Sequence, residues 1–197
     1  MKEQEANPVV AHLSMLVSAH PGLVLRGEER ATFERECPDL ETIAAASSAN
    51  AEALIQCAWA YRKLAKFDHA LRMADAAIAA DRSWKSLTAK ASVCRAMGDV
   101  NPAIALFDEA ATLDPTDTSA LMEGARTLGE AERLEDAAIW FGRVVDRDAS
   151  NTEALLWREY CLHCLTKSPK HVDNVRAVLK GDPHNGVAAE LLGYMTG

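Results

Sequence analysis

Two cysteines and two histidines lie close together in the segment EYCLHCLTKSPKH, residues 159–171. Thiolates and imidazoles are common zinc ligands, and two cysteines three residues apart are also typical of thiol–disulfide oxidoreductases. The candidates for such chemistry are Cys161, His163, Cys164 and His171. Whether they act together depends on the secondary structure that carries them.

The composition is that of an acidic globular protein. Of the 197 residues, 49% are hydrophobic and 25% are charged, which suits one large domain or two small ones. The net charge of −8 argues against nucleic acid as a partner, because phosphate binding depends on Lys and Arg. The N-terminal MKEQEANP is not a secretory signal and no apolar run is long enough for a membrane span, so we expect a cytoplasmic protein with no membrane partner. Its five cysteines are then expected to be free thiols.

A repeat of about 34 residues organises most of the chain. Aspartates recur at intervals of 33, 34 and 34 residues, and an alanine precedes each of the first three by eleven residues. The alanines are Ala70, Ala103 and Ala137, and the aspartates are Asp81, Asp114, Asp148 and Asp182. Between these marks, apolar residues recur three and four positions apart. Each repeat is therefore predicted to be two amphipathic helices joined by a short turn.

Small and large residues alternate within each repeat at fixed positions. Residues 84–117 show the pattern most fully, with Leu87, Ala91, Cys94, Gly98, Val100, Ala103, Phe107, Ala110 and Pro115. This pattern resembles the tetratricopeptide repeat family. The ranges 51–83 and 118–151 are similar to it, and 152–185 is degenerate, with Glu159 and His171 where small residues belong. The resemblance implies an all-α fold, a right-handed superhelical solenoid whose concave face is lined by the first helix of each repeat.

The two ends of the chain do not follow the repeat. Residues 1–50 are predicted to form an N-terminal helical segment, in which Asn7 caps a helix that starts at Pro8. Further helices are predicted at 28–36 and 39–47, and Asn50 is predicted to cap the first repeat. Residues 186–197 begin like a repeat and then stop, so we expect a C-terminal capping helix.

The helical assignment answers the question about the cysteines and histidines. Cys161, His163 and Cys164 fall on the first helix of the fourth repeat, where His163 points about 100° away from Cys164 and about 200° from Cys161. A zinc site would need another ligand pair, and cysteines in the middle of a helix lack the N-terminus that stabilises a thiolate. We expect no metal, no cofactor and, since no catalytic motif occurs, no enzyme.

The concave face is the expected working surface. In proteins of this family, ligands lie along a few positions of each first helix, and aromatic and Arg side chains dominate the energetics of many interfaces. The residues that this resemblance assigns to partner binding are Ile55, Trp59, Arg62, Thr88, Ser92, Arg95, Met122, Arg126, Leu156, Trp157 and Tyr160. The alternative for Trp59 and Tyr160 is packing against the N-terminal helices or the C-terminal cap.

These observations favour a protein–protein interaction module, an adaptor or chaperone that holds a segment of a protein or peptide partner in the groove. A narrower version is a bacterial secretion chaperone, which the chain resembles in having N-terminal helices before about three repeats. The alternative is a structural or assembly protein, a homo-oligomer that self-associates through its repeats or N-terminal helices. The Lys and Asn residues with which some family members bind carboxylate-ended chaperone tails are absent, so such tails are not expected as partners.

Overall fold

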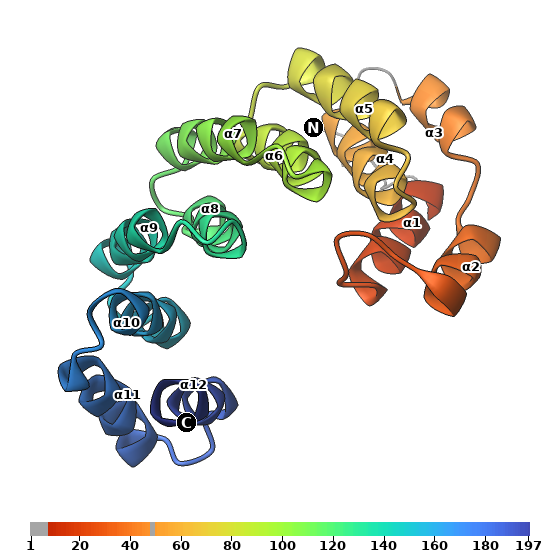
Figure 1. Cartoon of the computed structure of the whole chain (residues 1–197). Coiled ribbons are helices and arrows are strands. Elements are labelled where there is room, and N and C mark those ends of the chain that lie inside the picture. The colour runs from red at the N-terminus through yellow and green to blue at the C-terminus, as the bar shows by residue number, and fades with distance from the viewer. Residues whose placement is uncertain (1–7, 48–49) are drawn as a thin grey trace. The chain divides into compact units, whose positions relative to one another are not determined.

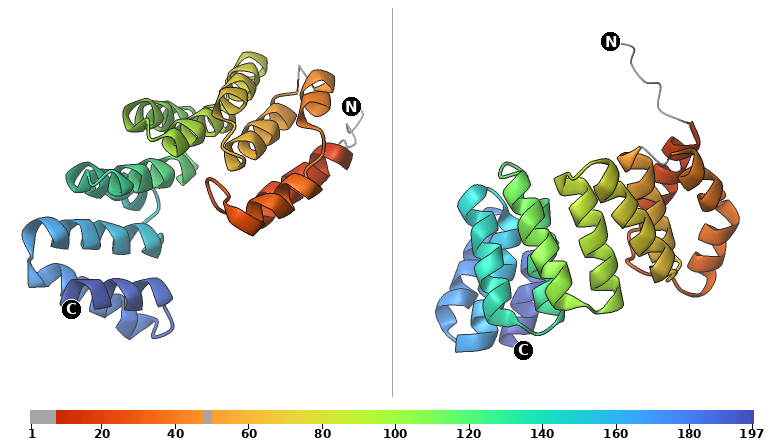
Figure 2. Two further views of the ribbon diagram at one scale, coloured as in Figure 1. Left: turned by 45° about the vertical axis from the view of Figure 1, so that its right-hand side comes forward. Right: turned by 90° about the horizontal axis from the view of Figure 1, so that it is seen from above.

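A computed structural model describes residues 8–47 and 50–197, and within these ranges every regular element is an α-helix (Figures 1 and 2). The chain divides into two compact units, the first ending at Leu113 and the second running from Asp114 to Gly197. The first unit contains α1 (Pro8–Ala19), α2 (Gly27–Glu36), α3 (Leu40–Ala46), α4 (Ala51–Lys63), α5 (Phe67–Ala80), α6 (Trp84–Met97) and α7 (Val100–Leu113). The second contains α8 (Ser119–Glu130), α9 (Leu134–Arg147), α10 (Thr152–Thr166), α11 (Pro169–Gly181) and α12 (Gly186–Thr196).

Several helices begin and end where the sequence supplies capping residues. The side chain of Asn50 accepts a backbone hydrogen bond in the first turn of α4, as predicted, and Asn151 and Asn185 do the same for α10 and α12. Gly98 follows α6 in the left-handed conformation, with φ of +86°. The predicted cap at Asn7 lies outside the described residues.

The N-terminal helices of the first unit pack against α4. Leu13 and Leu16 of α1 and Phe33 of α2 are buried in one cluster with side chains of α4. Lys63, at the end of α4, is 2% exposed, and its ammonium group donates to the carbonyl of Gly22 at 2.9 Å and to that of His20. Burial lowers the pKa of Lys63 to about 8, with a further contribution from nearby Arg62.

In the second unit, each helix packs against the next one along the chain. Trp140 of α9 is buried and lies directly over Gly124 of α8, where an added Cβ would come within 2.2 Å of the indole ring. The tryptophan therefore depends on a residue without a side chain beneath it. At the C-terminal end, Leu191 and Met195 of α12 are buried against α11, so α12 covers the last helix pair.

The fourth repeat replaces small residues with a buried polar pair. In the first three repeats, fully buried alanines let the two helices approach, namely Ala58 with Ala70, Ala91 with Ala103, and Ala125 with Ala137. The equivalent residues of α10 and α11 are Glu159 and His171, and Glu159 is 6% exposed. Its Oε2 lies 2.7 Å from Nδ1 of His171 and accepts a hydrogen bond from the amide of Asn174 at 2.8 Å.

The predicted all-α fold is confirmed. The helix pairs α4–α5, α6–α7, α8–α9 and α10–α11 fall within the four predicted repeat ranges, and α12 begins where the capping helix was expected. No helix in the described part of the chain is long and apolar enough to cross a membrane.

Candidate functional site

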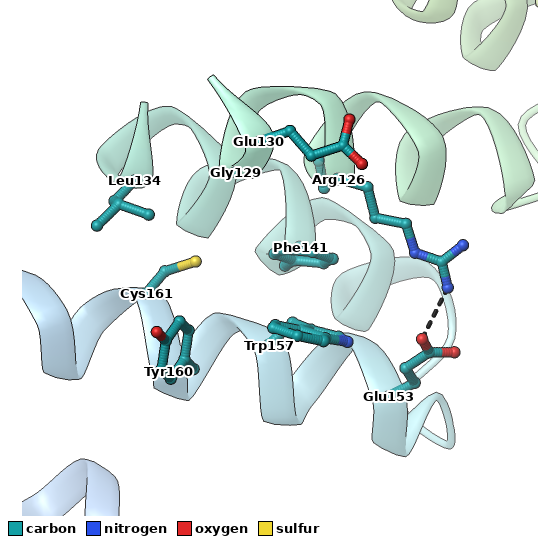
Figure 3. Close-up of a pocket in the computed structure, with 10 residues that line it drawn as sticks. Arg126, Gly129, Glu130, Leu134, Phe141, Glu153, Trp157, Tyr160 and Cys161 are labelled. Carbon is teal, nitrogen blue, oxygen red and sulfur yellow. Dashed lines mark hydrogen bonds and ion pairs between the residues drawn. The ribbon is translucent and has the colours of Figure 1, made fainter. Parts of the chain in front are cut away.

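The second unit contains a cavity of about 450 Å³ between α8, α9 and α10 (Figure 3). Three of the residues that line it, Arg126, Trp157 and Tyr160, are among those expected to bind a partner. The full lining comprises Ala125, Arg126, Gly129, Glu130, Leu134, Phe141, Glu153, Trp157, Tyr160 and Cys161. We refer to this cavity as the α8–α10 pocket.

One end of the pocket is aromatic and apolar. Phe141 is 2% exposed and comes from α9, whereas Trp157 and Tyr160 are half-buried on α10. The rings of Trp157 and Tyr160 meet edge to face, with centroids 5.9 Å apart and an interplanar angle of 89°. In Figure 3, Leu134 and Cys161 lie on the side of Trp157 that faces away from Arg126 and Glu153. Such a surface suits a large apolar side chain.

The opposite end of the pocket is charged. Arg126 of α8 forms two ion pairs. Its Nη2 lies 2.7 Å from Glu153 of α10 (Figure 3), and its Nη1 lies 3.0 Å from Glu123. The three side chains are between 33% and 45% exposed, so each pair adds little to stability. The two ion pairs hold the guanidinium group at the charged end of the pocket.

A missing side chain keeps the α8 wall of the pocket open. Gly129 lies near the C-terminal end of α8 with ordinary helical backbone, and a Cβ added there would meet nothing within 4 Å. One turn earlier, Ala125 is fully buried. Since residues four apart share a helix face, these two small residues leave space opposite Trp157 and Tyr160.

The cysteine and histidine candidates have separate partners. His171 contacts Glu159, whereas Nδ1 of His163 lies 3.4 Å from the carbonyl oxygen of Ser168. Burial raises the pKa of the Cys161 thiol to about 11, which leaves it protonated near neutral pH. Within residues 8–47 and 50–197, no group of three or more His, Cys, Asp or Glu side chains is arranged to hold a metal ion.

Four of the eleven predicted binding residues have almost no accessible surface. Ile55 and Leu156 are 2% and 1% exposed in hydrophobic clusters, and Arg62 and Met122 are each 8% exposed. Ile55 and Leu156 belong to packed clusters of their units, and all four side chains have little surface left for a partner. Their assignment to partner binding stays a prediction. The same position of the repeat can therefore be accessible in one repeat and buried in another.

The other predicted residues keep accessible surface. Trp59 is half-buried and packs against the cluster formed with the N-terminal helices, which was the alternative prediction for it. Trp157 and Tyr160 also contact the cluster beneath α12 on one side while they line the pocket on the other. Thr88, Ser92 and Arg95 are half-buried on α6, outside the pocket.

Sequence reasoning missed several lining residues. Phe141 occupies a position that the repeat pattern assigns to packing between helices, and nothing in the pattern marks it as a pocket wall. Gly129 departs from the larger residues found at its position in other repeats, which is a signal that was available. Glu153 lies in the first turn of α10, where a glutamate is common for electrostatic reasons alone, so its residue type gives no signal of a pocket.

A second cavity, of about 520 Å³, lies in the first unit between α2 and α5 and is lined mainly by polar residues. Tyr61 donates to Glu41 there at 2.9 Å, and the rings of Tyr61 and His69 are in contact. Burial raises the pKa of Cys37 to about 11, so its thiol stays protonated and is not activated as a nucleophile. None of the eleven predicted residues lines this cavity.

Comparison with known proteins identifies the fold through structure alone. No protein-family profile matches the sequence, and no curated protein matches it. Among solved structures, a tetratricopeptide repeat protein from Parabacteroides merdae superposes with a TM-score of 0.66 at 13% identity, covering 96% of this chain and 73% of that one. The protein YrrB, described as a TPR protein with an unusual peptide-binding site, gives 0.61 at 16% identity with 96% and 92% covered. A thermophilic TPR protein from Thermus thermophilus gives 0.65 at 10% identity with 95% and 97% covered. The chain therefore has the fold of tetratricopeptide repeat proteins.

Proposed function

We propose that this protein is a protein–protein interaction module that holds a segment of a partner protein in the α8–α10 pocket. The observation that carries the proposal is the convergence of Arg126, Trp157 and Tyr160 on one cavity with an apolar end. Aromatic and Arg side chains in a pocket that excludes water are the usual anchors of protein interfaces. The same geometry suits an adaptor or a chaperone, and the identity of the partner distinguishes these roles.

The solved structures with a similar fold support an interaction role in general. Their fold stacks helix pairs and leaves the first helices of the pairs available to ligands. YrrB, which is similar in fold, is described as having a peptide-binding site. Burial raises the pKa of Cys37, Cys57 and Cys161, so these three thiols stay protonated near neutral pH, which is consistent with a binding rather than a catalytic role.

Filling the pocket tests the proposal without removing any contact. Gly129→Leu places a side chain in the open space beside Trp157, and leucine is more favourable than glycine in a helix by about 1 kcal/mol. The matched control is Gly193→Leu in α12, where a Cβ likewise meets nothing within 4 Å and the residue lies outside the pocket. Both variants should unfold at or above the wild-type temperature.

The measurement is affinity capture from a native lysate, followed by hydrogen exchange of the captured complex. We expect wild type and Gly193→Leu to capture the same partner, Gly129→Leu to lose it, and the partner to slow exchange in α8 and α10. Equal capture by all three proteins would show that the pocket is not the binding site.

Self-association is the second candidate. Ile139 is 63% exposed and Leu165 is 40% exposed, and both line a shallow cavity of about 350 Å³ between α9 and α10. Exposed apolar side chains gathered in one place are typical of interaction surfaces. If this surface joins two copies of the chain, sedimentation equilibrium will show a concentration-dependent mass that Ile139→Glu abolishes. A constant monomer mass would exclude this role.

A further inference from the structure

The first helix of the first unit, α1, packs on α4 through one apolar face (Figure 1). Leu13, Leu16 and Val17 lie three and four residues apart, so they share a side of the helix, and all three are buried in one cluster with side chains of α4. The helix contains no Asp, Glu, Lys or Arg, and Met15 on its other side is 73% exposed. This is how an amphipathic helix binds in the groove of a partner.

Lys63 binds the stretch that follows α1 through main-chain groups. Its ammonium group donates to the carbonyls of His20 and Gly22, and its own carbonyl accepts from the backbone N–H of Leu25 at 2.8 Å. Residues 20–26 have no regular secondary structure, so their backbone groups are available for these bonds. Main-chain bonds depend on the path of a segment rather than on its side chains. The same three bonds are therefore open to a segment of another sequence.

This face of α4 contains buried polar groups whose burial has a cost. Lys63 is 2% exposed, and burial lowers its pKa to about 8; nearby Arg62 lowers the pKa further, whereas Glu29 acts in the opposite direction. Gln56 lies two turns before Lys63 on the same side of α4 and is 4% exposed. Its side-chain oxygen has no hydrogen-bond partner among the described residues. Both groups favour a face that is open or differently occupied.

The order of α1 depends on its contact with α4. The helix has no acidic residue in its first turn and no basic residue in its last, so its ends lack the charges that stabilise a helix dipole. Val9, Val10 and Val17 are β-branched, and at 12 residues the helix is near the length at which isolated helices are marginal. Detachment from α4 is therefore coupled to unfolding of α1, as in segments of low local stability.

We propose that residues 8–25 are an internal ligand that keeps this face of α4 closed, and that the face binds a partner helix of the same kind when it opens. The partner segment is an amphipathic helix without Asp, Glu, Lys or Arg, followed by a short non-helical stretch whose carbonyls accept from Lys63. The α8–α10 pocket belongs to the other unit, so the inference does not depend on the function proposed for that pocket.

The probe is a fluorescein-labelled peptide with the sequence of residues 8–25, and the receptors are full-length proteins. Leu13→Ala/Leu16→Ala weakens the internal ligand without changing α4, and Met15→Ala is the matched control on the exposed side of α1. The internal segment competes at an effective concentration on the order of 1 mM, so wild type and Met15→Ala should bind the peptide weakly. The double variant should bind it at least about tenfold more tightly, measured by fluorescence anisotropy.

A lysine variant and a shorter peptide locate the contact. In the background of the double variant, Lys63→Met should weaken binding of the 8–25 peptide by about tenfold, the ratio expected for lost hydrogen bonds from a charged donor. A peptide of residues 8–19 lacks the carbonyls that Lys63 binds, so its binding should not change. Gly129→Leu, which fills the α8–α10 pocket, should affect neither peptide.

Circular dichroism checks that each variant keeps its helices apart from α1, and Leu16→Ala alone replaces the double variant if that protein does not fold. The inference is overturned if the opened variant binds the peptide no more tightly than Met15→Ala does. It is also overturned if Lys63→Met weakens both peptides alike, because Lys63 would then act only on the fold. Loss of binding in Gly129→Leu would place the peptide in the other unit and overturn it as well.

Discussion

Replacing His171 of α11 by alanine should destabilise the second unit more than any substitution of an exposed residue. His171 and Asn174 are the two side chains that hold the carboxylate of Glu159, with distances of 2.7 Å and 2.8 Å. The Glu159 side chain is 8% exposed and that of His171 is 13% exposed, so water compensates poorly for a lost partner. Glu159→Ala removes the opposite half of the same pair.

The magnitude follows from what each variant leaves behind. Leaving a buried polar group short of a hydrogen-bond partner costs about 1–3 kcal/mol, and more when the group is a carboxylate. Asn174 still donates to Glu159 in His171→Ala, so we expect about 3 kcal/mol for that variant. The double variant Glu159→Ala/His171→Ala leaves no buried charge and restores the two alanines of the other repeats. It should cost no more than either single variant, which gives a coupling energy of at least about 2 kcal/mol.

Urea unfolding followed by tryptophan fluorescence measures this cycle. In a Trp59→Phe/Trp84→Phe background, the remaining tryptophans, Trp140 and Trp157, both report on the second unit. Equal slopes among the four proteins are needed for the comparison. If the two single variants sum to the effect of the double variant, the pair is not coupled and this description of the fourth repeat is wrong.

Three further predictions concern single features. Gly124→Ala should lower stability by about 1–3 kcal/mol, since its Cβ would come within 2.2 Å of Trp140, and an unchanged thermal midpoint would contradict that packing. Asn151→Ala should cost about 1 kcal/mol in urea unfolding by removing the cap of α10, whereas Asn151→Asp should restore most of it. Burial raises the pKa of Cys57 to about 12, so the unfolded thiol ionises near pH 9 while the folded one stays neutral. Stability should therefore fall as pH rises from 9, by about 1.4 kcal/mol at pH 10 for this group. Cys57→Ala should flatten this decline, measured by urea unfolding at each pH. An equal decline in the variant would refute the assignment.

The helices were predictable because their signals are local. Apolar residues three and four apart, an asparagine before a helix and a glycine after one act within a few residues, so Asn50 caps α4 and Gly98 ends α6 as the sequence indicates. The exchange of alanines for Glu159 and His171 was equally visible. Its consequence, a buried polar cluster completed by Asn174, required knowledge of how α10 and α11 face each other.

The binding face was harder to predict because a helix face has no sharp edge. Residues four apart on a helix differ in direction by only about 40°. Leu156 and Tyr160 are such a pair on α10, yet Leu156 is 1% exposed and Tyr160 lines the pocket. The neighbouring helix decides which of the two is covered, and that information lies in residues distant along the chain.

A comparison of α4 with α8 explains why an open pocket is found in the second unit. In the first unit, the irregular stretch between α1 and α2 lies on α4, and Lys63 donates to the carbonyls of His20 and Gly22. At the repeat position of Lys63, α8 carries Glu130, and at the preceding position it carries Gly129. Gly129 opens space where α4 has a buried side chain. Glu130 has an acceptor group at the position where Lys63 of α4 has a donor. The face that holds the chain's own carbonyls on α4 thus carries on α8 an open space, and this space is part of the α8–α10 pocket.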